Sequence, residues 1–292
     1  MNDQVTELRE HVAPYGAMRS VMPDHIYVPA PNSQIYTSPC IVAHVSTPFD
    51  VMVALTACRK SFSICVNDVA LTRNAMVVGS GARTLDASGA HLVLIQFNPL
   101  HPIYHLLRGQ RRAVPLNREA FAPFDRELEG AYRGELTLPE AQALYQHTQE
   151  QLMLQLDAVP PIDPRVHQVM LWLYENPRLQ VEELATRNHL SYDRMSHLFM
   201  DELGISIRSF QVWVKLFRAM SNLRYGQSIA QLSQVAGFSD AAHLSRVFKN
   251  VYGAPPSYFF FSGNVKLVAS HTGPIPGTPL PDTTRSVAYA TA

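Results

Sequence analysis

The spacing of apolar residues changes along the chain, and each change predicts a different kind of structure. Over about residues 20–98, short runs rich in Val, Ile and Phe alternate with Pro, Asn, Asp and Gly, as in IVAHV, FDVMVAL, FSICV and AHLVLIQF. Such runs predict strands. Asn67 and Asp68 lie between two of them and predict the tip of a hairpin. Closely spaced strands without helical stretches between them favour an antiparallel barrel or sandwich.

The spacing then becomes helical. PLHPIYHLLRG predicts a short helix, and NREAFAPFDRELEGAYRG predicts a helical stretch that Pro123 interrupts. TLPEAQALYQHTQEQLMLQLD predicts a longer helix that begins at Thr137, with Glu140 at the spacing of a capping box. Leu144 and Leu152 belong to its apolar stripe, which either packs on its own domain or contacts a second copy of the chain.

Three prolines, Pro160, Pro161 and Pro164, mark the clearest boundary, because they cannot continue a helix and they stiffen a linker. A tail rich in Pro, Gly, Ser and Thr ends the chain, and this composition predicts flexibility. The expected parts are a sensor and dimerisation domain over 1–159, whose helices cover about 99–157, an all-helical domain over 160–262, and a flexible tail over 263–292.

One pattern occurs twice in the helical domain: a helix, a short turn and a second helix. It appears in VEELATRNHLSYDRMSHLFMDELG and again in SIAQLSQVAGFSDAAHLSRVFKNVYG. Small residues, Ala185 and Ser233, stand where paired helices would cross. Ser191 and Ser239, 48 positions apart, are expected to cap the second helices. A joining helix of about 16 residues would be roughly 24 Å long. Such a spacer can hold two recognition helices in successive major grooves, about 34 Å apart.

These residues give the chain a clear resemblance over positions 165 to about 259. The stretches SIAQLSQVAGF, SRVFKNVYG and PPSYF resemble the DNA-binding domain of the AraC/XylS family of transcription regulators. The resemblance implies that residues 1–160 form a cupin-like β-barrel followed by dimerisation helices. The expected fold class is therefore α+β, with an N-terminal cupin-like antiparallel β-barrel and a C-terminal all-α domain containing two helix-turn-helix units.

The resemblance also implies which residues contact DNA. Arg246 would lie on the groove face of the second recognition helix and form two hydrogen bonds to guanine or bind a phosphate. Its alternative is a surface ion pair. Lys249 is expected to contact phosphate, whereas Arg218 matches an arginine that ties the helices together. The other candidates share the exposed sides of the two helices: Tyr192, Asp193, Arg194 and His197 in the first unit, and Asp240, Ala241, Ala242 and His243 in the second.

Three positions depart from the family pattern. His197 stands where the family usually has arginine, and His189 where it usually has glycine in the first turn. Phe259 follows a tyrosine where arginine is frequent. The first unit is therefore expected to read DNA more weakly than the second, or to read a different edge of the bases.

Composition adds little to this interpretation. Lys plus Arg equals Asp plus Glu, 24 each, which argues against binding of nucleic acid by bulk charge. Residues 163–262 carry 10 basic and 8 acidic residues, or +2, while residues 1–162 carry 12 and 15, or −3. This sign is expected for a nucleic-acid module behind an acidic regulatory half. Three cysteines without a CxxC pair, no visible signal peptide and no apolar run long enough for a bilayer predict a cytoplasmic protein without a membrane partner.

No motif in the chain predicts catalysis. His101 and His105 have the spacing of metal ligands on a helix, but Pro102 lies between them and no HExxH surrounds them. The chain also lacks HxH, a P-loop, GxSxG and a dinucleotide fingerprint. We therefore expect no enzyme, no cofactor and no metal, and interpret the barrel as a sensor. Its polar candidates for binding an effector, each of which could instead be a surface residue, are His44, Arg73, Arg83 and His91.

The main hypothesis is a sequence-specific DNA-binding transcription regulator controlled by a small molecule or partner at the barrel. Its expected partners are double-stranded DNA, a second copy of the chain and RNA polymerase. One alternative is a promoter-associated protein that acts mainly through protein contacts, with weak readout by the first unit. Another is a metal-dependent cupin enzyme fused to a DNA module. The sequence identifies neither the effector nor the operator.

Overall fold

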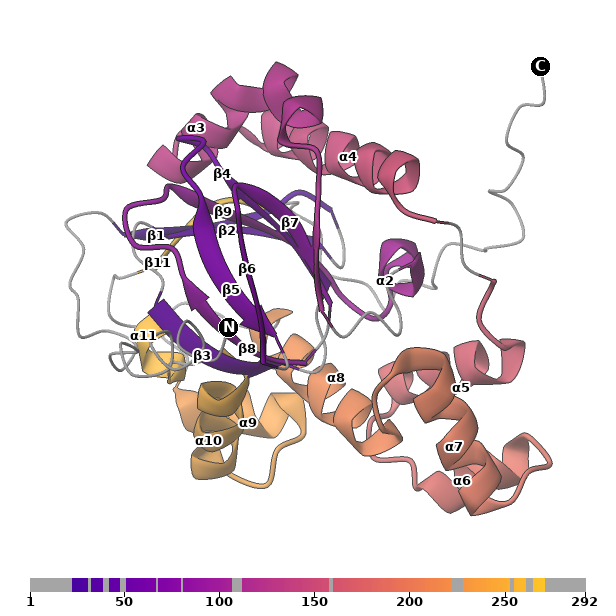
Figure 1. Ribbon diagram of the computed structural model, residues 1–292. Coiled ribbons are helices and arrows are strands. Elements are labelled where there is room, and N and C mark those ends of the chain that lie inside the picture. The colour runs from indigo at the N-terminus through magenta and orange to yellow at the C-terminus, as the bar shows by residue number, and fades with distance from the viewer. Residues whose placement is uncertain are drawn as a thin grey trace.

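A β-sandwich, flanking helical segments and a cluster of helices follow one another along the chain in the computed structural model (Figure 1). The structure describes residues 23–270 except 31–32, 39–41, 48–50, 67, 80, 107–111, 158–159, 222–227, 253–254 and 261–264.

Two sheets form the sandwich. The strands are β1 (Asp24–Val28), β2 (Ser33–Ser38), β3 (Val42–Thr47), β4 (Val51–Thr56), β5 (Phe62–Val66), β6 (Val69–Arg73), β7 (Ala75–Val78), β8 (Gly81–Asp86), β9 (Leu92–Phe97), β10 (Ala113–Pro115) and β11 (Val265–Ser270). One sheet has the order β10-β7-β4-β9-β2-β1-β11 and the other β3-β8-β5-β6. No strand pairing closes these sheets into one barrel in the described part of the chain, so the expected barrel is an open sandwich. The α+β class is confirmed.

The predicted hairpin is confirmed by the pairing of β5 with β6. Val66 lies opposite Val69, so two residues make the turn. Asp68 has a φ of 64°, the left-handed conformation that such tight turns require. Asn67 lies outside the described residues.

Alternation along β4 explains why this strand is buried on both faces. Val53 and Leu55 belong to an apolar cluster shared with the flanking helices. Met52 and Ala54 belong to a second cluster, which also contains Ile64 of the opposite sheet. Because successive side chains of a strand point to opposite faces, one strand supplies both cores.

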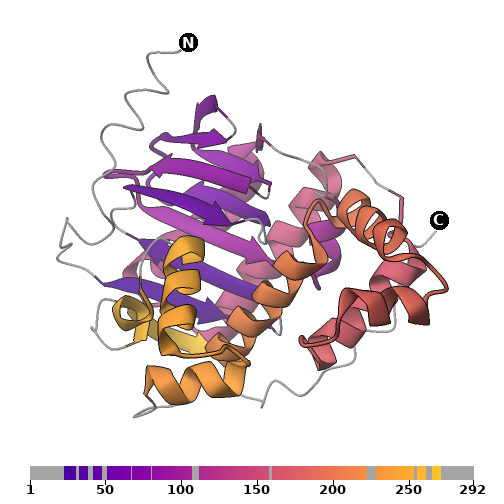
Figure 2. The ribbon, with the colours of Figure 1, turned by 90° about the horizontal axis from the view of Figure 1, so that it is seen from below.

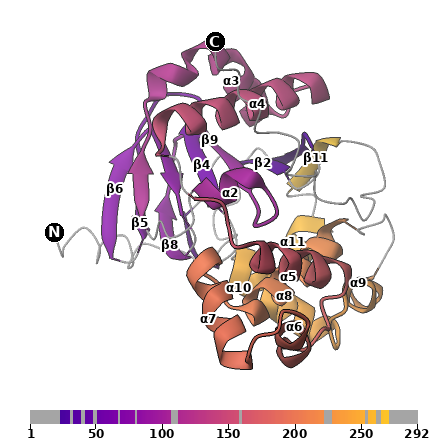
Figure 3. The ribbon, with the colours of Figure 1, turned by 90° about the vertical axis from the view of Figure 1, so that its right-hand side faces the viewer.

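Helical segments cover the outer face of the seven-stranded sheet (Figure 3). Helices α3 (Asp125–Arg133) and α4 (Leu138–Gln155) contact its strands, and the 3₁₀ segment η1 (Arg118–Phe124) packs on both of them. Helix α2 (Pro102–Leu106) lies toward the C-terminal helices. The capping box is confirmed, since the Glu140 carboxylate accepts the Thr137 N–H at 2.9 Å. Leu144 and Leu152 of the apolar stripe are fully buried. The stripe therefore packs within the chain and is not available to a second copy.

The C-terminal helices are α5 (Pro164–Glu175), α6 (Val181–Arg187), α7 (Tyr192–Leu203), α8 (Ile207–Ser221), α9 (Ile229–Ala236), α10 (Ala241–Tyr252) and α11 (Pro256–Phe260). Figure 2 shows α8 running between the first helix pair, α6 and α7, and the second, α9 and α10. Ala185 and Ser233, predicted at the helix crossings, are 2% and 1% exposed. Within the described segments, no helix combines the length and the apolar character that a membrane span requires.

The two halves contact each other at several places. The Tyr104 hydroxyl of α2 donates to the Leu203 carbonyl at the end of α7, at 3.1 Å. The Tyr258 hydroxyl of α11 donates to the buried carboxylate of Asp24 in β1, at 3.3 Å. Helix α10 lies against β3. These contacts hold the helical cluster against the sandwich.

The flexible tail expected over 263–292 is wrong for β11. This strand pairs in parallel with β1 at the edge of the larger sheet, from Val265 opposite Asp24 to Ser270 opposite Val28. The run VKLVAS has the branched and apolar residues that suit a strand. An open sheet edge supplies its hydrogen-bonding partners, which composition alone does not reveal. Residues 271–292 lie outside the described part.

Candidate nucleic-acid interface

Glycine makes the turn of the second helix-turn-helix unit. Gly237 has a φ of 85°, which glycine adopts without a steric cost. The Asp240 carboxylate then accepts the His243 N–H at 2.7 Å and caps α10. The predicted cap, Ser239, is wrong: it lies one residue too early, and its hydroxyl donates to Asp240 at 2.9 Å. The true caps, Ser191 and Asp240, are 49 positions apart.

The exposed side of α10 carries the predicted groove face. Arg246, Lys249 and Ala242 are exposed, whereas Leu244 and Phe248 of the same helix are buried. In the described part of the chain, no hydrogen bond or ion pair engages the Arg246 guanidinium or the Lys249 ammonium group. Both cations are therefore exposed and unpaired within the described residues.

Three residues of the second unit that are predicted to contact DNA are partly buried or already interact within the protein. Ala241 is half-buried at the start of α10. The His243 ring packs edge-on against Phe238, with centroids 5.3 Å apart, and lies 2.9 Å from the Ser239 hydroxyl. The Asp240 carboxylate is held in the cap, and its hydrogen bonds, first that from the His243 N–H, lower its pKa. Ala242, like Asp240, is exposed.

The first unit has the same architecture with a histidine in its turn. His189 has a φ of 54°, so it occupies the left-handed conformation that Gly237 has in the second unit. Ser191 accepts the Arg194 N–H at 3.2 Å and caps α7 as predicted. Tyr192, Asp193, Arg194 and His197 all lie exposed on α7. The structure thus brings the four predicted residues together on one helix.

His197 differs from its counterpart Arg246 in what it can offer to DNA. Its Nδ1 lies 2.7 Å from the carbonyl oxygen of Asp193, so Nδ1 carries a proton and donates to the backbone. In the neutral ring, only Nε2 remains, and it accepts a hydrogen bond. Arginine offers several donors in one plane. At matching positions, the first recognition helix therefore offers one ring nitrogen to DNA and the second offers a planar set of donors.

Arg218 ties the helices together, as the sequence predicts. Its guanidinium donates to the carbonyl oxygens of Tyr174 and Glu175 at the end of α5, both at 2.7 Å. Burial lowers the pKa of Arg218 from its ordinary value.

A cleft of about 380 Å³ beside α7 and α8 contains basic residues that the sequence analysis does not single out. Arg178, Arg208 and Lys215 line it, together with Tyr192 and Gln211. The spacing of residues 208, 211 and 215 places them on one face of α8. Arg178 comes from the loop before α6, so no periodic signal in the sequence connects it with the others.

Of the four predicted effector residues, the structure describes the side chains of Arg73 and His91, and each of these has a contact within the protein. Arg73 is exposed in β6 and donates to its neighbour Thr72. His91 stacks on Tyr132, with ring centroids 4.0 Å apart, and lies 3.3 Å from the Glu129 carboxylate. His44 and Arg83 lie on the paired strands β3 and β8, but their side chains are outside the described part.

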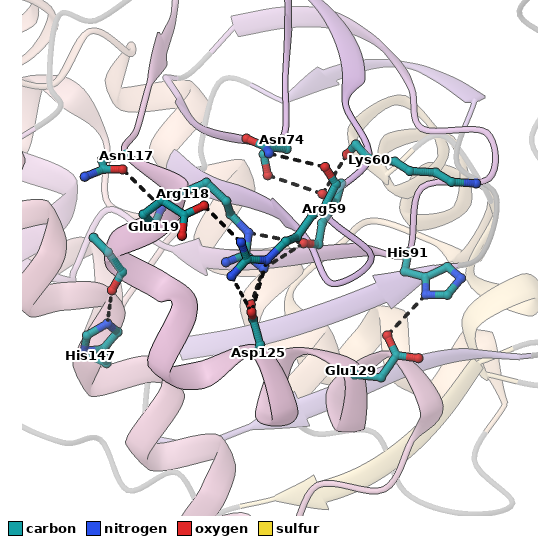
Figure 4. A network of polar contacts seen from close by, with 12 residues as sticks. Arg59, Lys60, Asn74, His91, Asn117, Arg118, Glu119, Asp125, Glu129 and His147 are labelled. Atoms are coloured by element: carbon teal, nitrogen blue, oxygen red, sulfur yellow. Dashed lines mark hydrogen bonds and ion pairs between the residues drawn. The ribbon is translucent and has the colours of Figure 1, made fainter.

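A network of hydrogen bonds and ion pairs joins the sandwich to the helical segments beside it (Figure 4). Arg59 and Arg118 both donate to Asp125, at 2.6 Å, and Arg118 also donates to the Thr56 carbonyl at 3.1 Å. Partial burial raises the pKa of Asp125, but the hydrogen bonds from the two arginines outweigh it and leave the pKa below its ordinary value. The network ties the turn after β4 to η1 and α3, so it supports the fold.

His101 is a half-buried ring that packs against aromatic side chains. It lies 5.1 Å from Phe97 and 5.8 Å from Tyr145, and burial lowers its pKa to about 4. Its Nδ1 accepts the Ile103 N–H at 3.1 Å. Across the part of the chain that the structure describes, no three His, Cys, Asp or Glu side chains form a group that could hold a metal ion.

Comparison with known proteins identifies relatives of this chain. Residues 184–260 match a family described as a helix-turn-helix domain. The chain is 34% identical over 122 residues to the arabinose operon regulatory proteins of Salmonella typhimurium and Escherichia coli, covering 38% of this chain and 43% and 41% of theirs. It is 33% identical over 82 residues to the Msm operon regulatory protein of Streptococcus mutans, covering 28% and 30%. The chain thus spans less than half the length of these curated relatives.

Solved structures share the fold over a longer stretch. ToxT from Vibrio cholerae, in a crystal structure with a bound unsaturated fatty acid, superposes with a TM-score of 0.56 at 10% identity, covering 85% of this chain and all of that one. A second ToxT structure gives 0.55 over 78% and 96%. At this identity the likeness shows the fold alone. The family match and the curated relatives confirm the resemblance predicted from the sequence.

Proposed function

We propose, from the premise that the C-terminal part of this chain is an AraC-type helix-turn-helix domain, that the protein binds specific DNA sequences and regulates transcription. The observation that carries the proposal is the pair of recognition helices, α7 and α10, whose polar faces remain exposed on either side of α8. Helix α8 has 15 residues, which corresponds to about 22 Å. A rigid spacer of this length suits two helices that enter successive major grooves.

The sandwich is the proposed sensor. Its fold is shared with ToxT, one structure of which contains an unsaturated fatty acid. In this proposal a small molecule or a partner protein bound at the sandwich changes DNA binding through the contacts between the two halves. The protein would act in the cytoplasm as a homodimer, without catalysis, and would contact RNA polymerase at the promoter.

Selection from a random DNA pool tests the proposal. The full chain is incubated with random duplexes of about 30 base pairs, long enough for two grooves one turn apart, and bound DNA is sequenced over several rounds. We expect enrichment of one motif with two short conserved blocks, centred about 10 base pairs apart. The matched control is Arg246→Ala/Lys249→Ala, which should enrich the second block poorly. A wild-type protein that enriches no motif would contradict the proposal.

A further inference from the structure

The basic cleft is lined by residues 177–182, Tyr192 and one face of α8, and one of these residues approaches the second helix-turn-helix unit. Tyr192 on its wall is the first residue of the recognition helix α7. On another wall, Arg178 reaches the second unit: its Nε lies 3.9 Å from the position that a Cβ on Gly237 would take. Gly237 makes the turn that leads to α10. The cleft therefore touches elements of both units and the helix that joins them.

The loop that carries Arg178 is held in place by side chains. The backbone N–H of Arg178 donates to Asn176 Oδ1 at 3.1 Å, and the Arg178 carbonyl accepts from Gln180 Nε2 at 3.0 Å. Gln211 of α8 donates to the Leu179 carbonyl at 2.7 Å. Because these bonds fix the backbone on both sides of Arg178, little conformational freedom of the loop is lost when the cleft binds a ligand.

Three positively charged side chains line this cleft. Burial, and then the charge of Arg178, lower the pKa of Lys215 from its ordinary value. Arg208 adds a third cation, while Glu182 is the one carboxylate among the described residues of the cleft wall. In the described part of the chain, no ion pair joins any of the three cations to a carboxylate. An anion in the cleft would relieve this repulsion.

A duplex read by both units must cross this region. Between two successive major grooves it presents a minor groove, bordered on both sides by phosphates. We propose that Arg178, Arg208 and Lys215 bind backbone phosphates where the duplex passes from the groove read by α7 to the groove read by α10. This inference rests on the proposed function. It makes the cleft a positioning site, which fixes the spacing of the two units on DNA without reading bases.

The salt dependence of DNA binding tests the inference. Dissociation constants of the full chain are measured on its selected duplex and on random duplexes at several salt concentrations. We expect Arg178→Ala/Arg208→Ala to weaken both alike and to flatten the slope of log K against log salt by about 0.9 for each phosphate that the variant no longer neutralises. Arg178→Lys/Arg208→Lys should keep most of the slope. Arg126→Ala, an exposed charge on α3, is the matched control and should change nothing.

Two results would overturn the inference. One is a salt slope that Arg178→Ala/Arg208→Ala leaves unchanged, although Lys249→Ala weakens DNA binding. This result would leave the proposed function intact. The other is saturable binding of inorganic phosphate or pyrophosphate to the wild-type protein, abolished by the double variant, without any effect of that variant on DNA. The cleft would then hold a free anion. Failure of the wild-type chain to bind any duplex is a different outcome, because it contradicts the proposed function itself.

Discussion

Arg246 and His197 occupy matching positions on the two recognition helices, but only Arg246 can form two parallel hydrogen bonds to guanine. His197 already uses Nδ1 on the Asp193 carbonyl. A bidentate pair is worth about 1–3 kcal/mol of discrimination, or roughly ten- to a hundredfold in affinity. We therefore expect Arg246→Ala to cost more specific affinity than His197→Ala and to relax the preference at one base pair. Titrations on selected and random duplexes check this; a larger loss in His197→Ala would reverse the ranking.

The turn of the first unit stores strain that the second unit lacks. The left-handed conformation costs an L-residue roughly 1–2 kcal/mol, somewhat less for histidine, and glycine avoids it. Part of the stability gained by removing this strain is offset, because glycine gives the unfolded chain more conformational freedom. We expect His189→Gly to raise the free energy of unfolding by about 0.5–1 kcal/mol. The reciprocal change, Gly237→Ala, should lower it by about 1–2 kcal/mol. Urea denaturation measures both, and destabilisation by His189→Gly would show that its side chain contributes more than the strain costs.

At the scale of elements, the end of α3 shows how tightly the helices pack on the sheet. Gly134 has a φ of 79°, and a Cβ there would lie 2.4 Å from Nε2 of the buried His25 in β1. Gly134→Ala should therefore cost the backbone strain and a steric clash, about 2–5 kcal/mol in all. Gly204, with a φ of 71° and open space around it, is the matched control. Its alanine variant should cost about 1–2 kcal/mol, and equal losses at both glycines would contradict the clash.

Helix α4 contrasts a buried and an exposed leucine. Leu144 is fully buried and Leu154 is 77% exposed. We expect Leu144→Ala to lower the free energy of unfolding by about 2–5 kcal/mol and Leu154→Ala to change it by less than about 0.5 kcal/mol. Denaturation curves give these values. A stable Leu144→Ala variant that sediments as a smaller species than the wild type would instead assign the stripe to contact between copies.

The sequence predicts those elements whose signals are local. Both helix-turn-helix units, the capping box at Thr137 and the β5–β6 hairpin depend on short patterns, and the structure contains them. The pattern does not distinguish the cap at Asp240, because Ser239 and Asp240 are both good caps and the second turn is one residue longer than the first. Strand β11 and the basic cleft depend on residues far apart in the chain, which periodicity cannot connect.

At the scale of the whole molecule, we expect the helical domain to bind DNA without the sandwich. A fragment from about 160 to 262 should prefer the same DNA sequence as the full chain, because the exposed faces of α7 and α10 belong to it. Its affinity should be lower, since one module provides half the contacts of a dimer. Selection and titration of the fragment beside the full chain check this. A folded fragment without sequence preference would mean that the sandwich is needed to arrange the two units.

The pairing of β11 with β1 also protects the molecule from its own copies. A strand at the edge of a sheet presents a row of unsatisfied N–H and carbonyl groups, and such edges recruit strands from other chains into aggregates. Strand β1 would be an edge of this kind, with the apolar side chains of Ile26 and Tyr27 along it. By covering β1 with its own later residues, the chain moves the edge of the sheet to β11, where the exposed charge of Lys266 disfavours pairing with a strand of another copy.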